Sequence, residues 1–174
     1  MVVGKPIAKP LNSRVASQID LMPGDIALGT SGTHMRTLLG SCVSVILTDP
    51  RHTIAAMNHI VHVGRPNAAN QENTAYGSVS MHQMFKRLQG AGINARMCDA
   101  YVYGGGNMFP HLFQERHVGT SNAAWVEQFL RNEGIRVVDQ LTGGSGYRKI
   151  SWTVGVGEPL VETVLASAGD PHVR

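Results

Sequence analysis

Two apolar runs separated by a turn signal stand out in the first third of the chain. Residues 43–47 are β-branched and aliphatic apart from one serine, which favours a buried strand over a helix. An Asp-Pro pair at positions 49 and 50 fits the start of a type I turn, and residues 54–57 form the second run. A hairpin with this tight turn places Cys42 directly opposite His59. A longer loop or a bulge would shift the register, and a shift of one residue would move one side chain to the other face.

Both faces of this predicted hairpin are mostly apolar. The face shared by Cys42 and His59 also carries Ile46 and Met57, and the other face carries valine, leucine and isoleucine side chains. A sheet with two apolar faces has to be covered on both sides. We therefore expect a sheet that lies between other layers of the molecule.

Further elements follow along the chain. Apolar stripes at helical spacing predict two helices, one over about 79–89 capped by Ser78 and one over about 123–132 capped by Ser121 or Asn122. Apolar segments predict strands at about 25–29, 100–103, 135–139 and, more weakly, twice within 148–164. Residues 30–34 and 67–75 are polar and predict loops. The order predicts an α/β protein of the α+β type: a layered sandwich with a mixed, largely antiparallel sheet covered by two main helices.

One folded domain is expected over residues 23–165. An arm rich in Pro, Lys, Ser and Asn, residues 1–22, precedes it, and a frayed tail, residues 166–174, follows it. Within the domain, three consecutive glycines at 104–106 lack the Lys-Ser/Thr ending of a phosphate loop. They predict a tight strand exit where backbone passes close to another segment. Asn107, directly after them, is a candidate to hydrogen-bond whatever lies there.

The composition limits the classes of protein that fit. The chain has 174 residues, of which 43% are hydrophobic and 16% charged, enough for one sizeable core. The net charge of +3 is mild and no dense basic tract interleaved with aromatics occurs, which argues against nucleic acid as the main partner. The start of the chain lacks the apolar core of a signal peptide, and no stretch suits a membrane span. With two cysteines only, we expect a cytoplasmic protein with reduced thiols and no membrane insertion.

Cys42 is the first candidate for chemistry. The pKa of a free thiol is about 8.5 and the thiolate is the nucleophile, so a histidine on the same face would activate it. The alternative is that Cys42 is an apolar filler, the usual role of a free cysteine, and we expect that role for Cys98. The eight histidines show none of the close ligand spacings of a zinc site. We therefore expect no metal.

The segments around Cys42 and His59 carry a resemblance to a known family. Thr37-Leu-Leu-Gly-Ser-Cys-Val-Ser-Val45, followed by Met57-Asn58-His59, is the most specific part, and Tyr103-Gly-Gly-Gly-Asn-Met-Phe109 adds weaker support. Together they resemble the CheD family, the chemoreceptor glutamine deamidases of bacterial chemotaxis. The resemblance spans roughly residues 23–157.

This resemblance implies a reaction and a set of residues. The reaction is hydrolysis of glutamine side-chain amides on methyl-accepting chemoreceptor proteins through a thioester on Cys42, with no cofactor. His59 is implied as the general base and Thr37 as the residue that orients its ring; Thr33 is the alternative, because versions of the family motif carry an extra residue between the threonine and the cysteine. Backbone N–H groups near Ser41 and Cys42 are candidates for oxyanion stabilisation. The implied substrate-binding residues are Ser41, Asn58 and Asn107.

Two other interpretations stay open. The same thioester route would hydrolyse glutamyl methyl esters on receptors. The chain would alternatively be a non-catalytic adaptor, because proteins of this family also associate with receptors and with a CheC-type phosphatase. Loss of ammonia release in a Cys42→Ala variant separates the enzyme from the adaptor.

Overall fold

Nine strands and two α-helices make up residues 17–165, the part of the chain that the computed structural model describes. The strands are β1 (Ser17–Leu21), β2 (Ile26–Thr30), β3 (Thr33–Leu39), β4 (Val43–Thr48), β5 (Ile54–Asn58), β6 (Asp99–Gly104), β7 (Arg136–Thr142), β8 (Tyr147–Thr153) and β9 (Leu160–Val164). The helices are α1 (Gly77–Gly90) and α2 (Val118–Asn132), with a short 3₁₀ helix, η1 (Ala95–Met97), before β6.

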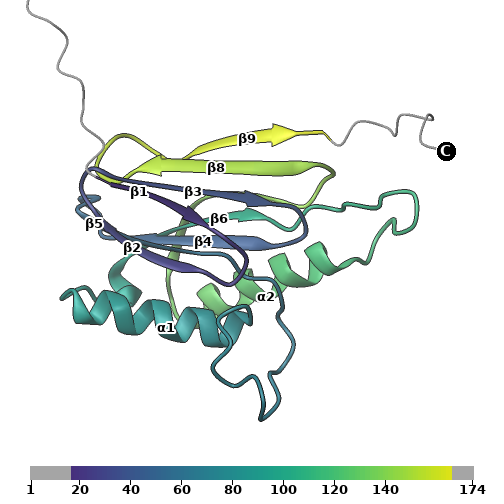
Figure 1. Cartoon of the computed structure of the whole chain (residues 1–174), viewed down its shortest axis with the longest axis horizontal. Helices are drawn as coiled ribbons and strands as arrows, with labels where there is room; N and C mark the ends of the chain where they lie inside the picture. The colour runs from purple at the N-terminus through teal and green to yellow at the C-terminus, as the bar shows by residue number, and fades with distance from the viewer. Residues whose placement is uncertain (1–16, 166–174) are drawn as a thin grey trace, which may run out of the picture.

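The strands form two sheets stacked face to face (Figure 1). One sheet has the order β1-β3-β8-β9 and the other β2-β5-β4-β6-β7. Neighbouring strands are antiparallel except for the parallel pairs β1–β3 and β6–β7. The expected α+β sandwich with mixed, largely antiparallel pairing is confirmed, and its strands divide between two sheets.

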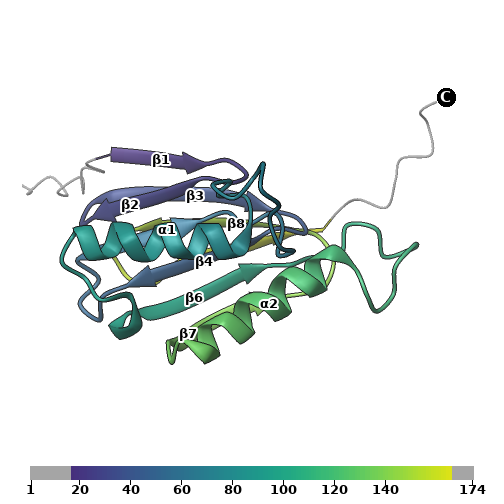
Figure 2. The same ribbon diagram turned by 90° about the horizontal axis from the view of Figure 1, so that it is seen from below.

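Each face of the five-stranded sheet is covered, as the apolar faces of the hairpin predict. On one face, α1 packs against β2 and β5, and α2 packs against β4, β6 and β7 (Figure 2). The four-stranded sheet covers the other face (Figure 1). Buried side chains between helices and sheet include Val45, Leu47, Met84 and Val126. Those between the two sheets include Met35, Ile46, Tyr103 and Trp152.

The turn of the β4–β5 hairpin is longer than predicted. A four-residue turn is present at residues 49–52, since the backbone N–H of His52 donates to the carbonyl oxygen of Asp49 over 2.8 Å. His52 then adopts a left-handed conformation, with φ of 54°, and the Asp49 carboxylate accepts hydrogen bonds from the N–H groups of Thr53 and Ile54. Two extra residues therefore enter the loop before the ladder begins.

This longer loop corrects the predicted register. The structure pairs Ile46 with Met57 and Val43 with Ile60, so Cys42 does not lie directly opposite His59. It lies diagonally, two residues along the ladder. Because side chains alternate between faces along a strand, a shift of two residues keeps both on one face. The prediction that Cys42 and His59 share a face is confirmed, and the prediction that they lie directly opposite each other is wrong.

Several boundaries also differ from the predictions. Residues 17–21 form β1 beside β3, so the folded domain begins inside the expected 1–22 arm; residues 1–16 and the predicted 166–174 tail lie outside the described residues. The predicted loop over 30–34 is only a turn between β2 and β3. The N-caps are Tyr76 for α1 and His117 for α2, rather than Ser78 and Ser121 or Asn122.

Candidate active site

The β3–β4 connection carries the chain from the four-stranded sheet to the five-stranded sheet, and Cys42 is its last residue. All three of its carbonyl oxygens accept hydrogen bonds from the rest of the molecule. The Gly106 N–H donates to Gly40 over 2.9 Å and the Gly105 N–H donates to Cys42 over 2.8 Å. The Ser41 carbonyl accepts from the Asn122 side-chain amide over 3.0 Å. The path of the nucleophile candidate is therefore fixed on one side by glycine backbone and by α2.

The glycines that follow β6 make this close approach possible. Gly104 has φ of 112°, and a Cβ built there would lie 2.2 Å from the carbonyl oxygen of Cys42. A Cβ at Gly119 in α2 would lie 2.5 Å from the backbone of Gly105. Only residues without a side chain allow strand exit, helix and connection to meet at these distances. The tight strand exit predicted for residues 104–106 is confirmed, with the Cys42 connection and α2 as the segments it approaches.

His59 follows β5 and is buried, with 3% of its surface exposed. Its Nδ1 lies 2.8 Å from the hydroxyl oxygen of Thr37 in β3. The Thr37 hydroxyl in turn donates to the carbonyl oxygen of Leu21 over 3.0 Å. Because a hydroxyl has one proton to donate, it accepts from His59, so Nδ1 carries the ring proton. The lone pair of the neutral ring is then on Nε2, which leaves this nitrogen able to accept a proton.

Cys42 is half-buried and contacts the apolar cluster between the two sheets, the cluster that includes Ile46 and Met57. This contact places its side chain on the same face of the five-stranded sheet as His59. Diagonal neighbours on one sheet face are within reach of long and aromatic side chains. The thiol, the imidazole and the Thr37 hydroxyl therefore all lie at the inter-sheet face, with the hydroxyl contributed by the opposite sheet.

Burial shifts both titrating groups toward their neutral forms. It raises the pKa of the Cys42 thiol, because a thiolate loses hydration there. It lowers the pKa of His59 below the ordinary histidine value, because the imidazolium loses hydration in the same way. Both groups are therefore neutral at neutral pH, a thiol and an imidazole on one face of the sheet.

The structure separates two of the predicted residues from this arrangement. Thr33, the alternative to Thr37, lies at the other end of β3, where its hydroxyl accepts from Ser17 over 3.4 Å. Asn58 is fully buried on the helix side of the sheet. Its Oδ1 accepts from the Val45 N–H over 2.8 Å, and its Nδ2 lies 3.3 Å from the sulfur of Met81. Its polar atoms are therefore used in joining β4, β5 and α1.

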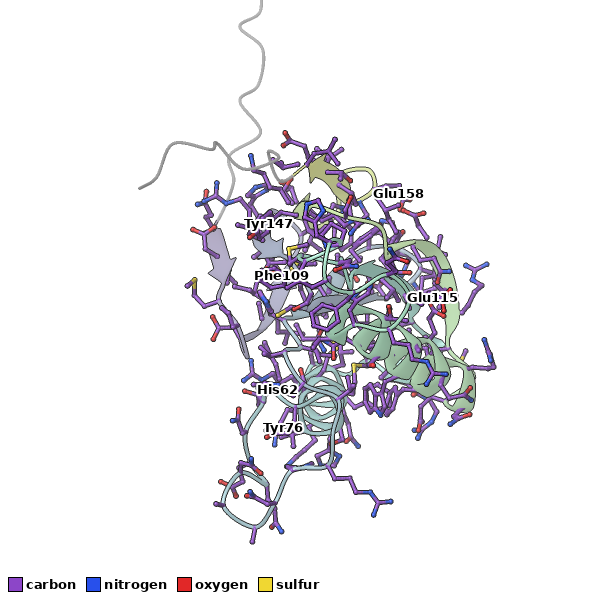
Figure 3. All side chains as sticks on the ribbon, turned by 90° about the vertical axis from the view of Figure 1, so that its right-hand side faces the viewer. His62, Tyr76, Phe109, Glu115, Tyr147 and Glu158 are labelled. Atoms are coloured by element: carbon purple, nitrogen blue, oxygen red, sulfur yellow. The ribbon has the colours of Figure 1, made fainter. Side chains whose placement is uncertain are left out.

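Asn107 organises the loop between β6 and α2. Its Oδ1 accepts from the N–H of Phe109 over 3.0 Å and its Nδ2 donates to the carbonyl of Phe113. A cavity of about 330 Å³ lies under this loop and is lined by Ser41 as well as Asn107. The end of the molecule that carries this loop faces the viewer in Figure 3, with Phe109 and Tyr147 labelled on it. Ser41 and Asn107 thus share a cavity next to Cys42, while the Asn107 amide is held within its own loop.

Asn122 is the residue that the sequence interpretation placed wrongly. The sequence predicts a helix cap at this position, but α2 begins at Val118 and the Asn122 side chain is buried in its second turn. The Nδ2 atom donates both to Ser41 and to the carbonyl oxygen of Val61, over 3.0 and 3.1 Å. The available signal for a buried role is that Asn122 is a polar residue among apolar helix positions. The sequence favours a cap instead because Asn is common at the N-cap position of helices.

Residues 17–165 also bear on metal sites and on membrane spans. No group of three or more His, Cys, Asp or Glu side chains in this part of the chain is placed to hold a metal ion. No helix among the same residues is long and apolar enough to cross a bilayer. Cys98 is buried, and burial raises its pKa to about 11, so its thiol is chemically quiet at neutral pH.

This α+β sandwich brings a half-buried cysteine and a threonine-bonded histidine to one inter-sheet face, the two kinds of group that thiol-dependent hydrolases use. Comparison with known proteins identifies the family. The family described as "CheD chemotactic sensory transduction" matches residues 62–163, and curated relatives extend the match over most of the chain. The chain belongs to the CheD family.

The relatives carry a common name. A protein of Albidiferax ferrireducens named "Probable chemoreceptor glutamine deamidase CheD 2" is 34% identical over 164 residues, covering 91% of this chain and 95% of its own length. A "Probable chemoreceptor glutamine deamidase CheD" of Caulobacter sp. is 33% identical over 80% of this chain and 73% of its own length. The similarly named Rhodospirillum rubrum protein is 31% identical over 84% of this chain and 82% of its own.

Proposed function

We propose that this chain hydrolyses the side-chain amide of specific glutamines on chemoreceptors to glutamate, with Cys42 as the nucleophile. The single observation that carries the proposal is the bond between Thr37 and the Nδ1 of His59, which leaves Nε2 as the proton acceptor on the face that Cys42 shares. The names of the relatives supply the substrate and the reaction. The geometry supports His59 as the base.

The first half of the reaction forms a thioester. The Cys42 sulfur attacks the amide carbon while His59 Nε2 takes the thiol proton, and the amide oxygen becomes an oxyanion. The imidazolium then gives its proton to the amide nitrogen, which leaves as ammonia. In the second half, His59 takes a proton from water as the water attacks the thioester carbon, and the thiolate leaves and is reprotonated. The product is a glutamate side chain, one negative charge more than the glutamine.

The carbonyl bonds of the β3–β4 connection support an oxyanion site. In a trans peptide the N–H points opposite to the preceding carbonyl. The carbonyls of Gly40 and Ser41 point at Gly106 and Asn122, so the N–H groups of Ser41 and Cys42 point away from them. Neither N–H donates to a backbone acceptor within residues 17–165. Two such donors beside a nucleophile suit a developing oxyanion, at about 3 kcal/mol per donor.

Partners and location follow from the same proposal. The substrate is a methyl-accepting chemoreceptor, and the site lies in the reduced environment of the cytoplasm, where the Cys42 thiol stays free. A CheC-type phosphatase is a second proposed partner, on the resemblance alone. Hydrolysis of glutamyl methyl esters on the same receptors would use the same thioester with methanol as the leaving group.

The test is incubation of the protein with cytoplasmic receptor fragments. We expect ammonia release and a gain of about 1 Da at each converted glutamine, both lost in Cys42→Ala while receptor binding persists. Cys98→Ala is the matched control and keeps the rate, because Cys98 is buried at the start of β6. Ammonia release at the wild-type rate from Cys42→Ala would overturn the mechanism, and binding without any ammonia release from the wild type would favour the adaptor.

A further inference from the structure

A basic hollow flanks the nucleophile connection. It is an open cavity of about 540 Å³ between the segment after β5 and the start of α2. Its wall includes two arginines and two histidines and contains no acidic side chain. The residues that matter below are His62, Arg65, Tyr76, Arg116, His117 and Asn122.

The charges of the basic hollow are not neutralised by the fold. Arg65 and Arg116 are exposed, and neither forms a salt bridge with a carboxylate in residues 17–165. The His117 Nδ1 accepts from the Thr120 N–H over 3.4 Å, so the proton of its neutral ring is on Nε2, a further donor. The amino-terminal end of α2, which starts at Val118, adds the positive end of a helix dipole. The hollow is thus built for an anion.

The basic hollow is joined to the candidate active site by one side chain. Asn122 lines the hollow, and its amide donates both to Val61, on the hollow wall, and to Ser41, next to the nucleophile. Arg116 and His117 also line the smaller cavity that contains Ser41. When the target glutamine of a substrate chain reaches Cys42, a neighbouring residue of that chain therefore lies within reach of Arg116. Figure 3 shows His62 and Tyr76, whose rings lie 5.1 Å apart, beside each other on the same end of the molecule.

We propose that the basic hollow binds the carboxylate of an aspartate or glutamate that flanks the target glutamine on the substrate, so that the enzyme selects acid-flanked glutamines. The inference rests on the proposed function for its glutamine target. The carboxylate accepts hydrogen bonds from the guanidinium groups, which suit planar oxyanions. Because the flanking charge is present before and during the reaction alike, the contact lowers KM more than it changes kcat.

The test uses a set of peptides with one target glutamine and a single flanking position occupied by Glu, Met or Lys, scanned over four residues on either side. We expect wild-type kcat/KM to be about fivefold higher for Glu than for Met at the preferred position, mainly through KM, and lowest for Lys. Arg116→Gln should lower kcat/KM for the Glu peptide to the variant's own value for the Met peptide, and Arg116→Glu should favour Lys. Arg51→Gln, which removes the same charge from the β4–β5 turn, should keep the wild-type preference. Added salt should shrink the preference.

The outcomes separate this inference from the proposed function. Equal wild-type kcat/KM for Glu, Met and Lys peptides overturns the inference and leaves the deamidase intact. If no peptide releases ammonia, the proposed function is contradicted, but peptide binding to Cys42→Ala still tests the inference. Tighter binding of the Glu peptide that Arg116→Gln abolishes supports the inference. Equal binding of the three peptides overturns it. Inorganic phosphate is the probe for another anion; Arg116-dependent binding of phosphate tighter than binding of the Glu peptide also overturns it.

Discussion

One hydroxyl group sets the protonation of the candidate base. Thr37 cannot donate to His59 while it donates to the Leu21 carbonyl, so the ring proton stays on Nδ1. A residue that selects the tautomer of a histidine acts through that histidine, and its loss is felt as a wrong ring orientation or a wrong proton position. Thr37 is thus a positioning residue in the proposed mechanism.

Replacing Thr37 by Val tests this role. The Val side chain keeps the shape and removes the oxygen that accepts from Nδ1, so we expect kcat to fall about 10- to 100-fold with KM nearly unchanged. Thr37→Ser retains the hydroxyl and should recover most of the rate. Steady-state ammonia release measures both. A Val variant as active as the Ser variant would show that the hydroxyl does not position the base.

The pKa of His59 predicts how stability depends on pH. Burial lowers its pKa in the folded state, so the unfolded chain binds the extra proton first as the pH falls. The stability contributed by the neutral ring is complete above about pH 6.5, the unfolded value, and is lost as the pH falls toward the folded pKa. Urea unfolding at pH 7.5 and 5.5 should show a smaller free energy of unfolding at pH 5.5. A smaller difference is expected for His59→Gln; an unchanged difference would contradict the assignment.

The roles of single residues were only partly readable from the sequence. Cys42 and His59 stood out because a thiol and an imidazole lay on one predicted face. The resemblance implies Thr37, but the residues alone leave Thr33 open as the alternative, because the choice depends on which end of β3 lies over His59. That is a contact between two sheets, and nothing local to either threonine encodes it.

At the scale of elements, three segments meet at the nucleophile: the strand exit at 104–106, the start of α2, and the β3–β4 connection. Their meeting depends on missing side chains at Gly104 and Gly119. It also depends on the Asn122 amide, which links α2 to the carbonyl oxygens of Ser41 and Val61. These contacts explain why a glycine-rich stretch without the ending of a phosphate loop lies against the connection that carries Cys42.

Gly104→Ala should therefore destabilise the folded protein far more than the same substitution at a glycine with open space around it. Its Cβ would meet the Cys42 carbonyl oxygen at 2.2 Å in addition to the strain of a positive φ, so we expect the free energy of unfolding to fall by more than about 3 kcal/mol. Gly143 also has a positive φ, of 75°, but open space at its Cβ position. Gly143→Ala should cost only the strain, about 1–2 kcal/mol. Equal losses in urea unfolding of the two variants would mean that the connection can move aside.

Elements were predicted better than the joints between them. The β4 and β5 runs, both helices and the strand exit follow from hydrophobic spacing and glycine placement. The register missed by two residues, because the Asp49 carboxylate adds two residues to the turn through its own hydrogen bonds. The prediction that Cys42 and His59 share a face is still correct, because a register error of two residues leaves each side chain on the same face.

At the scale of the whole molecule, the second sheet is what the sequence did not disclose. In β3, the buried positions of Thr33 and Thr37 alternate with those of Met35 and Leu39, so polar residues break the apolar alternation that marks a strand. In β1, residues 17–21 have only two apolar side chains. Both strands are recognisable from their pairing with distant partners and not from their own composition. The covered faces of the hairpin required another layer without revealing that the layer is a sheet.

The interior between the sheets also holds an unpaired charge. Arg148 in β8 is 4% exposed, and its Nε and Nη1 atoms have no hydrogen-bond partner within residues 17–165. Burial alone lowers its pKa. Arg148→Met should therefore raise the free energy of unfolding by about 1–3 kcal/mol, because an apolar side chain replaces an uncompensated cation. Arg148→Lys keeps the charge and should bring no gain. A destabilised Met variant in urea unfolding would reveal a partner for the guanidinium.

The bond between Thr37 and His59 spans the gap between two separate sheets. The proposed base, His59, belongs to one layer and Thr37, which binds its ring, to the other, while the proposed nucleophile, Cys42, lies on the short connection between them. Any slippage of one layer over the other, by even a fraction of a strand spacing, would break the proton path before a single ladder hydrogen bond is lost. Warming or mild denaturant should accordingly abolish ammonia release while the circular dichroism spectrum still shows intact secondary structure. The turnover rate would then report how tightly the two sheets pack.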